Sequence, residues 1–244
     1  HTWFGWNWDD DENETDILSG LLYEYKDDAR AALDAAKAAE TRQEWSLLCW
    51  QIGKCEWTEG FEREYPDGSI APTLPELREE LRKLIAPRTM CGIELEYSDQ
   101  VLYGFPLAVS EQLFLLAEDD DFLLNGFQIR RLRDIFELGG RKGIYQTIAE
   151  KEGLTDFEVP DVDITDWRSV FASLQKLGKH IIIEREYEPE FFRLGVIEAV
   201  GKDHVVFRHY DADGIWQEAA SIPYREITSV TFDDRYATTF AKYV

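Results

Sequence analysis

The chain carries one pattern of residues twice, at an offset of about ninety residues. Residues 94–97 read Glu-Leu-Glu-Tyr, and residues 184–187 read Glu-Arg-Glu-Tyr. Farther along, residues 132–135 read Leu-Arg-Asp-Ile, and residues 224–227 read Tyr-Arg-Glu-Ile. An offset of this length accommodates one small domain per copy, whereas solenoid repeats are shorter. We therefore expect two copies of the same small folded unit.

Each copy is predicted to open with a short helix. In the first, Thr73 supplies a capping hydroxyl, Pro75 suits the first helical turn, and Glu76 places a carboxylate near the positive helix end. The second helix is expected to begin at about Thr165 and to end at Gly178, because glycine readily adopts the left-handed C-cap conformation.

Short segments rich in β-branched and aromatic residues follow each helix and are separated by turn residues, including a tight hairpin turn at 211–214. So many short antiparallel strands bury both faces only by bending into a small barrel. The predicted fold class is α+β, with a mostly helical N-terminal region (1–70) followed by two helix-plus-barrel domains (71–157 and 158–244).

Two glycines occupy matching places near the start of the second strand of each copy, Gly104 and Gly195. A strand interior tolerates glycine poorly, because glycine has no side chain to pack. A matched pair therefore indicates a bend or a close backbone approach at a barrel corner, which is a structural role.

The chain is strongly acidic. Asp and Glu number 49 against 26 Lys and Arg, which gives a formal net charge of -23. Such a surface repels nucleic-acid backbones, so non-specific DNA binding is not expected, whereas basic partners are attracted. A nucleic-acid mimic would carry the same charge, and this alternative stays open.

Cysteine content and hydropathy suggest where the protein works. The three cysteines, Cys49, Cys55 and Cys91, show neither paired spacing nor a zinc-knuckle pattern. No apolar run reaches the ~20 residues that a spanning helix needs. We therefore expect a cytoplasmic protein without a membrane partner, and the oligomeric state is left open.

The order of the predicted elements resembles the Sm-like fold, a relative of SH3-type barrels. The resemblance rests on a leading helix, a strand opening on Gly-x-hydrophobic, a hydrophobic strand, a turn and the final segment 222–230, and it covers residues 73–138 and 163–232. The resemblance implies an Sm-like fold for each copy. In Sm-like proteins that bind RNA, this fold also forms a pocket for a base.

That pocket uses Asp and Asn at the turn before the third strand, and Arg-Gly or Lys-Gly before the last strand. Here the turns read Ser-Glu-Gln (110–112) and Gly-Lys-Asp-His (201–204), and the last strands follow Arg-Arg (130–131) and Pro-Tyr (223–224). The pocket residues are therefore not carried over.

A candidate binding surface combines aromatic planes with cations, as in proteins that bind single strands. It consists of Phe191, Phe192, Arg193, Arg208, His209 and Tyr210. A second basic cluster consists of Arg130, Arg131 and Arg133. The alternative is that these arginines pair with the abundant carboxylates.

The remaining polar patterns have structural explanations. An outward-facing strand face explains the alternating pairs Glu94/Glu96 and Glu184/Glu186, and hairpin tips explain the aspartates at 119–121 and at 211 and 213. The Gly-Gly-Arg-Lys-Gly loop (139–143) lacks the spacing of a phosphate-binding loop, and His204 and His209 fall on opposite strand faces. We therefore expect no enzyme activity, no metal and no cofactor.

The leading functional hypothesis is a non-catalytic binding or adaptor protein that recognises a protein or peptide partner through strand edges, loops and the groove between the domains. The alternatives are binding of single-stranded RNA through Sm-like barrels and the acidic nucleic-acid mimic.

Overall fold

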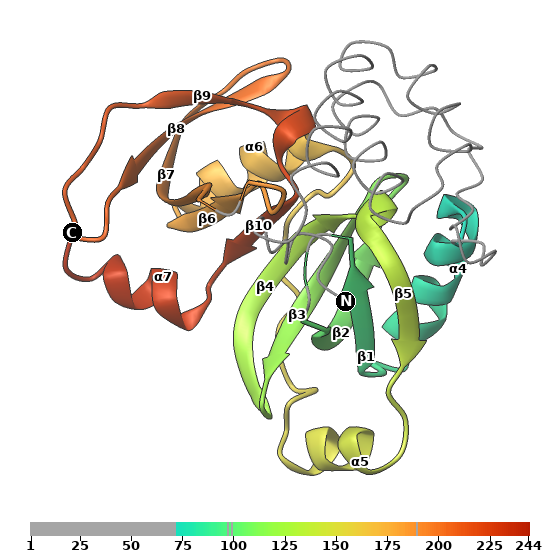
Figure 1. The fold of residues 1–244 in the computed structure, drawn as a ribbon. Helices are drawn as coiled ribbons and strands as arrows, with labels where there is room; N and C mark the ends of the chain where they lie inside the picture. The colour runs from blue at the N-terminus through green and yellow to red at the C-terminus, as the bar shows by residue number, and fades with distance from the viewer. Residues whose placement is uncertain (1–71, 97, 99, 189) are drawn as a thin grey trace, which may run out of the picture.

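The computed structural model of the protein describes residues 72–96, 98, 100–188 and 190–244 (Figure 1). This part of the chain has an α+β structure in which helices accompany one large antiparallel sheet. The helical region predicted for residues 1–70 lies outside the described residues.

Two segments, called the first half (74–151) and the second half (167–240), have the same order of elements. The first half contains α4 (Leu74–Ile85), β1 (Cys91–Leu95), β2 (Leu102–Val109), β3 (Leu113–Asp120), β4 (Leu123–Arg131), a 3₁₀ helix (Leu132–Asp134), β5 (Ile135–Gly140) and α5 (Ile144–Lys151). The second half contains α6 (Trp167–Leu177), β6 (Ile181–Glu184), β7 (Phe192–Val200), β8 (His204–Tyr210), β9 (Ala220–Pro223), a 3₁₀ helix (Tyr224–Glu226), β10 (Ser229–Phe232) and α7 (Arg235–Phe240).

The ten strands of the described residues form one open sheet, so the prediction of two closed barrels is wrong. Their order is β5-β1-β2-β3-β4-β10-β6-β7-β8-β9, and every neighbouring pair is antiparallel. The outer edge of β4 pairs with β10 of the second half instead of closing onto its own half. Pairing between the halves thus satisfies the backbone hydrogen-bonding groups at these strand edges, which barrel closure within each half would otherwise do.

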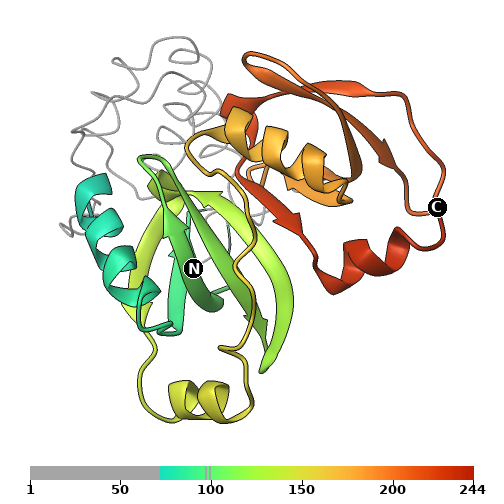
Figure 2. The same ribbon diagram turned by 180° about the vertical axis from the view of Figure 1, so that it is seen from behind.

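Local sequence signals set the helix ends as predicted. Thr73 and Glu76 form a reciprocal capping box at the start of α4, so two backbone N–H groups without helical partners are bonded. The α6 helix begins after Asp166, whose carboxylate accepts from the N–H of Ser169, and it ends at Gly178 in the left-handed conformation. In Figure 2, α4 and α6 lie on the same side of the molecule.

The hydrophobic core crosses from one half to the other. The cluster beneath α6 contains Phe171, Phe207 and Val230 of the second half and also Leu115 and Ile129 of the first. At the junction, the rings of Phe127 (β4) and Phe232 (β10) stack with centroids 5.3 Å apart. The two halves therefore share buried apolar surface, which couples their unfolding.

Candidate binding surface

Within the part of the chain that the structure describes, the β9 strand lies at one end of the sheet and pairs only with β8. Residues 217–221, which lead into and form this strand, are all exposed. The N–H of Tyr224 donates to the carbonyl oxygen of Asp203 at 3.0 Å. Because neighbouring residues of an antiparallel ladder direct their N–H and C=O groups to opposite sides, those of Ser221 point away from β8.

The corresponding edge in the first half is covered. There the N–H of Leu132 donates to the carbonyl oxygen of Gln112 at 2.8 Å, just as Tyr224 does to Asp203. The same alternation directs the backbone of Ile129 away from β3, where it pairs with Val230 of β10. No described strand therefore covers, on β9, the main-chain groups that correspond to those that β10 covers on β4.

Proline ends this exposed edge. Pro223 has no N–H, and by the same alternation the missing group would point away from β8. No ladder hydrogen bond is lost there, which is why proline is tolerated on an edge strand. The edge that no described strand covers is thus short and confined to residues before Pro223.

The structure divides the predicted aromatic and basic surface of the second half between two sides of the sheet. Leu194 faces Tyr210 and Val196 faces Arg208 across β7 and β8, so Phe192, Arg208 and Tyr210 share one side. On the other side, Phe191 packs against the core cluster beneath α6, and its ring lies 4.0 Å and 4.7 Å from the guanidinium carbons of Arg185 and Arg193. His209 faces Gly195 on this second side.

Several of the predicted arginines already have partners. Arg208 pairs with Glu198 at 2.8 Å and lies over the ring of Trp216 at 4.7 Å. Arg130 and Arg131 are only 7% and 5% exposed, so the predicted basic cluster is not a surface patch. The explanation by pairing with carboxylates is confirmed for these three residues, because Arg130 pairs with Glu186 and Arg131 with Asp134.

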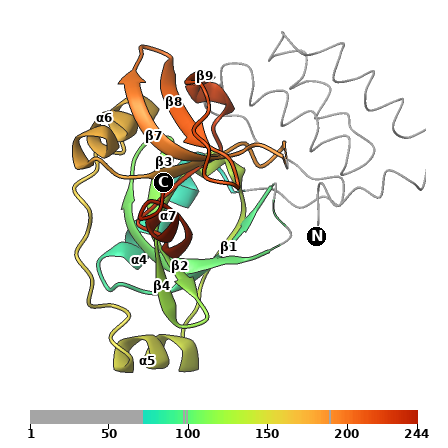
Figure 3. The ribbon, with the colours of Figure 1, turned by 90° about the vertical axis from the view of Figure 1, so that its left-hand side faces the viewer.

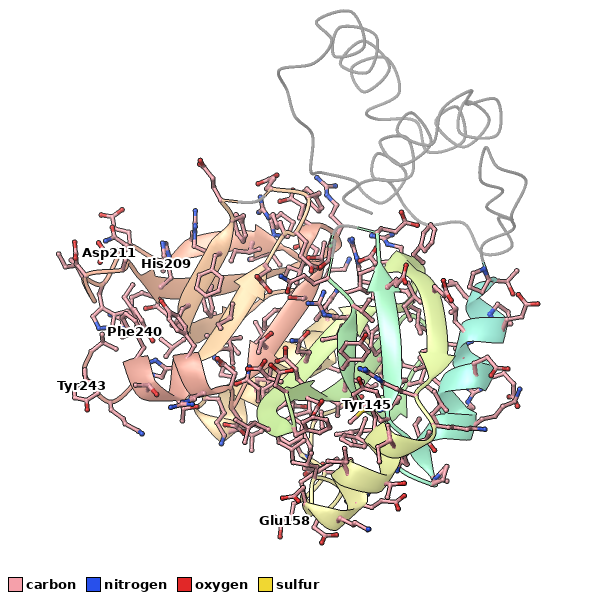
Figure 4. All side chains as sticks on the ribbon, turned by 60° about the horizontal axis from the view of Figure 1, so that its bottom comes forward. Tyr145, Glu158, His209, Asp211, Phe240 and Tyr243 are labelled. Carbon is pink, nitrogen blue, oxygen red and sulfur yellow. The ribbon has the colours of Figure 1, made fainter. Side chains whose placement is uncertain are left out.

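Phe192 and Tyr210 of the predicted surface belong to an aromatic cluster whose other members, Trp216, Tyr236 and Phe240, were missed from the sequence. Trp216 meets Tyr210 edge-on at 4.9 Å, Phe240 of α7 stacks on Tyr210 at 5.6 Å, and Tyr236 follows Phe240 at 5.2 Å. Phe192 then contacts Tyr236 edge-on at 6.0 Å. The aromatic pair at i and i+4 in residues 235–240 was the available signal. Figure 4 labels Phe240 of this cluster and Tyr243 near the C-terminal end.

A polar network lies at the junction of β4, β10 and β6. The Arg130 guanidinium donates to both carboxylate oxygens of Glu186 at 2.7 Å and to the amide oxygen of Gln128 at 2.6 Å. Ser229 donates to Glu184 at 2.8 Å. The expectation that Glu184 and Glu186 face outward is therefore wrong, since both carboxylates lie in this network, and Glu96 is also buried.

Several carboxyl groups here titrate above their usual range. Burial, and secondly the like charge of Glu186, raises the pKa of Glu184 above 4.5 although Arg130 and Ser229 oppose the shift. Burial also raises the pKa of Glu118 and of Asp234. The folded state consequently holds these protons more tightly than the unfolded chain.

Stability is expected to increase as the pH falls from 7.5 to 5.5. A carboxyl group whose pKa is raised on folding favours the folded state increasingly as the pH falls toward its unfolded value near 4.5. We expect the melting temperature to rise by about 2–5 °C over this interval. Thermal melts of the wild type and of Glu184→Gln measure it. The variant should show a smaller rise, and an unchanged or steeper rise would contradict the role of Glu184.

The two matched glycines face the neighbouring strand closely. A Cβ atom on Gly104 would lie 2.2 Å from the carbonyl oxygen of Ala117, and one on Gly195 would lie 2.0 Å from that of Arg208. Each glycine pairs with the first residue of its half's first strand, Cys91 or Ile181. Neither position has room for a side chain.

The other candidate sites have structural roles or no ligand geometry. In the 139–143 loop, the Arg141 guanidinium lies over the rings of Tyr103 and Tyr145, at 4.0 Å and 3.4 Å from their centroids. Asp211 closes its predicted turn by accepting from the N–H groups of Asp213 and Ile215. No metal-binding cluster of His, Cys, Asp or Glu occurs among the residues that the structure describes, and no helix there is long and apolar enough to cross a membrane.

A scan against protein-family models finds no match to this chain, and searches of the curated proteins and of the solved structures find none either.

Proposed function

We propose that the two halves are diverged copies of one Sm-like unit whose sheet has remained open. Three correspondences support this beyond the order of elements. The pairing register of β2 shifts at Leu107, three residues after Gly104, and that of β7 shifts at Glu198, three residues after Gly195. A 3₁₀ helix precedes the last strand in both halves. The first-strand pairing of each matched glycine is also the same.

We further propose that the protein is a non-catalytic binding protein that holds an extended segment of a partner protein along the β9 edge. One observation carries this proposal: no strand of the described residues pairs with the outward main-chain groups of Ser221, whereas those of Ile129, at the corresponding place, pair with β10. An added strand supplies main-chain hydrogen bonds without requiring a deep pocket.

The side chains along the edge and the charge of the chain define the partner further. Five exposed residues with small or polar side chains, 217–221, line the approach to the edge, so an incoming strand meets little steric hindrance. The net charge of -23 favours segments that carry Lys or Arg over acidic ones.

A peptide with the sequence of residues 227–232 and a lysine added at each end is a suitable probe, because β10 occupies the corresponding edge of β4 and the lysines suit an acidic chain. We expect it to bind the full chain with a dissociation constant on the order of 0.1–1 mM and to slow amide exchange at residues 219–222. Nuclear magnetic resonance titration measures both effects.

Ser221→Pro removes the outward N–H and should abolish this binding, whereas the matched control Ser221→Val keeps the N–H and should bind like the wild type. The proposal fails if the peptide does not bind, or if it binds Ser221→Pro as well as Ser221→Val. Light scattering distinguishes peptide binding from pairing of β9 with a second copy of the chain. Only self-association raises the molecular mass of the protein in the absence of the peptide.

Binding of single-stranded RNA has less support, because Arg208 and Arg130 are already paired with Glu198 and Glu186. A titration of labelled single-stranded RNA at low salt measures it directly, since binding through phosphates strengthens as salt is removed. The nucleic-acid mimic stays a prediction.

A further inference from the structure

A second surface, distinct from the β9 edge, extends across both halves. The tip of the β3–β4 hairpin projects between α5 and α7 in two perpendicular views (Figures 1 and 3). Contacts hold it on both sides. The ring of Phe122 stacks on Tyr145 of α5 with centroids 6.0 Å apart, and the N–H of Arg235 in α7 donates to the side-chain oxygen of Asn125 at 3.2 Å.

Exposed hydrophobic side chains concentrate along this line. Leu123 at the tip is 62% exposed, Ile144 of α5 is 65% exposed, and Tyr236 of α7 is 52% exposed. With three less exposed neighbours they make up six of the eleven exposed large hydrophobic side chains of the described residues. We call this surface the apolar band, and it consists of Leu123, Leu124, Ile144, Tyr145, Phe192 and Tyr236. Leu123 and Leu124 are consecutive residues of β4 and point to opposite sides of the hairpin, so these side chains surround its tip. Concentrations of exposed apolar side chains mark interaction sites.

The hairpin tip is held in an unfavourable backbone conformation. Its two-residue turn consists of Asp121 and Phe122, which have φ angles of 49° and 66°. Turns of this kind usually contain Asn or Gly, because a bulky side chain at positive φ is strained. The stacking of Phe122 on Tyr145 fixes this conformation, which presents Leu123 and Leu124 to solvent.

Carboxylates flank the apolar band. Asp119, Asp120 and Asp121 lie at the hairpin tip, and Asp234 precedes α7. One carboxylate oxygen of Asp119 and one of Asp234 are buried without a hydrogen bond. The nearby cation Arg141 is held between Tyr103 and Tyr145. Neither buried oxygen is accessible to a partner, but the exposed carboxylates of Asp120 and Asp121 are, so a cationic partner would be attracted beside the apolar surface and an anionic membrane would be repelled.

From this arrangement we propose that the apolar band docks an amphipathic helix of a partner protein, with an apolar stripe against the band and Lys or Arg on its flanks. A helix presents an apolar stripe with flanking polar positions at regular spacing, which matches an apolar band bordered by carboxylates. Docking here would bridge α5 of the first half and α7 of the second. Figure 4 looks toward this face, with Tyr145 near its centre.

The test uses the full chain and a synthetic 18-residue peptide in which Leu and Lys alternate at helical spacing. We expect fluorescence anisotropy to give a dissociation constant on the order of 10 μM at low salt. A peptide with Glu in place of Lys should bind at least tenfold more weakly. Leu123→Asp combined with Tyr236→Asp should weaken binding of the Lys peptide at least tenfold.

The matched control is Gln112→Asp combined with Gln217→Asp, which adds the same charge at exposed positions away from the apolar band. It should bind like the wild type, as should Ser221→Pro, so failure here is distinguishable from failure at the β9 edge. Thermal melts verify that each variant is folded. Equal binding of the Leu123/Tyr236 variant and the wild type, equal loss in the control, or equal affinity for the Glu peptide would overturn the proposal.

Discussion

Replacing Gly195 with alanine is expected to destabilise the protein by about 2–4 kcal/mol. The new Cβ atom would lie 2.0 Å from the carbonyl oxygen of Arg208 and 2.6 Å from the Cα atom of His209. Both are backbone atoms of β8, so no side-chain rotation relieves the clash. The strands must separate, which weakens pairing on both sides of β7. Denaturant unfolding of the wild type and the variant measures the difference.

Two further variants make this prediction specific. Gly104→Ala should behave like Gly195→Ala, because its Cβ atom would lie 2.2 Å from the carbonyl oxygen of Ala117. Gly139→Ala is the control, since nothing lies within 4 Å of a Cβ atom there. We expect it to change stability by less than about 0.5 kcal/mol. If Gly195→Ala and Gly139→Ala cost the same, close backbone approach does not explain the matched glycines.

Replacing Arg130 with methionine is expected to cost about 3–5 kcal/mol. Its guanidinium is the hydrogen-bonding partner of Glu186 and also lies within electrostatic range of Glu184 and Glu118. Removing it leaves these carboxylates in a largely buried place without their cation, which costs more than the ion pair itself contributes. Unfolding in denaturant at pH 7.5 measures the loss.

The order of effects within this network is also predicted. Glu186→Gln should cost less than Arg130→Met, because Glu184 and Glu118 still stabilise the guanidinium when Glu186 is neutral. The double variant Arg130→Met/Glu186→Leu should be more stable than the sum of the single losses implies, because no unpaired charge remains. Additive losses, or a larger loss for Glu186→Gln, would show that the charges do not act together.

Local signals in the sequence were sufficient for the helix starts and stops. Capping by Thr73 and the left-handed Gly178 depend on residues within one turn of each other, so their physics is visible in a short window. The α+β class and the order of strands followed from alternating segments and turn residues in the same way.

Whether each half closes into a barrel could not be predicted in the same way, because closure depends on which strand pairs with the outer edge of β4. The strand pattern indicates that β4 has a neighbouring strand on each side, but either β5 or β10 could hydrogen-bond to its outer edge equally well. The choice of β10 rests on contacts far apart in the chain, such as Phe127 with Phe232 and Arg130 with Glu186. A single sequence does not reveal such pairs.

The candidate site was predictable only in part. Phe192, Arg208 and Tyr210 share a side of the sheet, but Phe191, Arg193 and His209 fall on the other side because strand residues alternate. The arginines of β4 look like a basic patch in the sequence, whereas burial and pairing with carboxylates remove them from the surface. The β9 edge became recognisable only when the sheet order was known.

Amide hydrogen exchange of the unmodified chain at Ile129 and Ser221 tests the central claim most directly. If β10 covers the edge of β4 while the edge of β9 is free, the N–H of Ile129 should exchange on the order of a thousandfold more slowly than that of Ser221. Equal exchange at the two positions in the monomeric protein would contradict both the junction between the halves and the open edge.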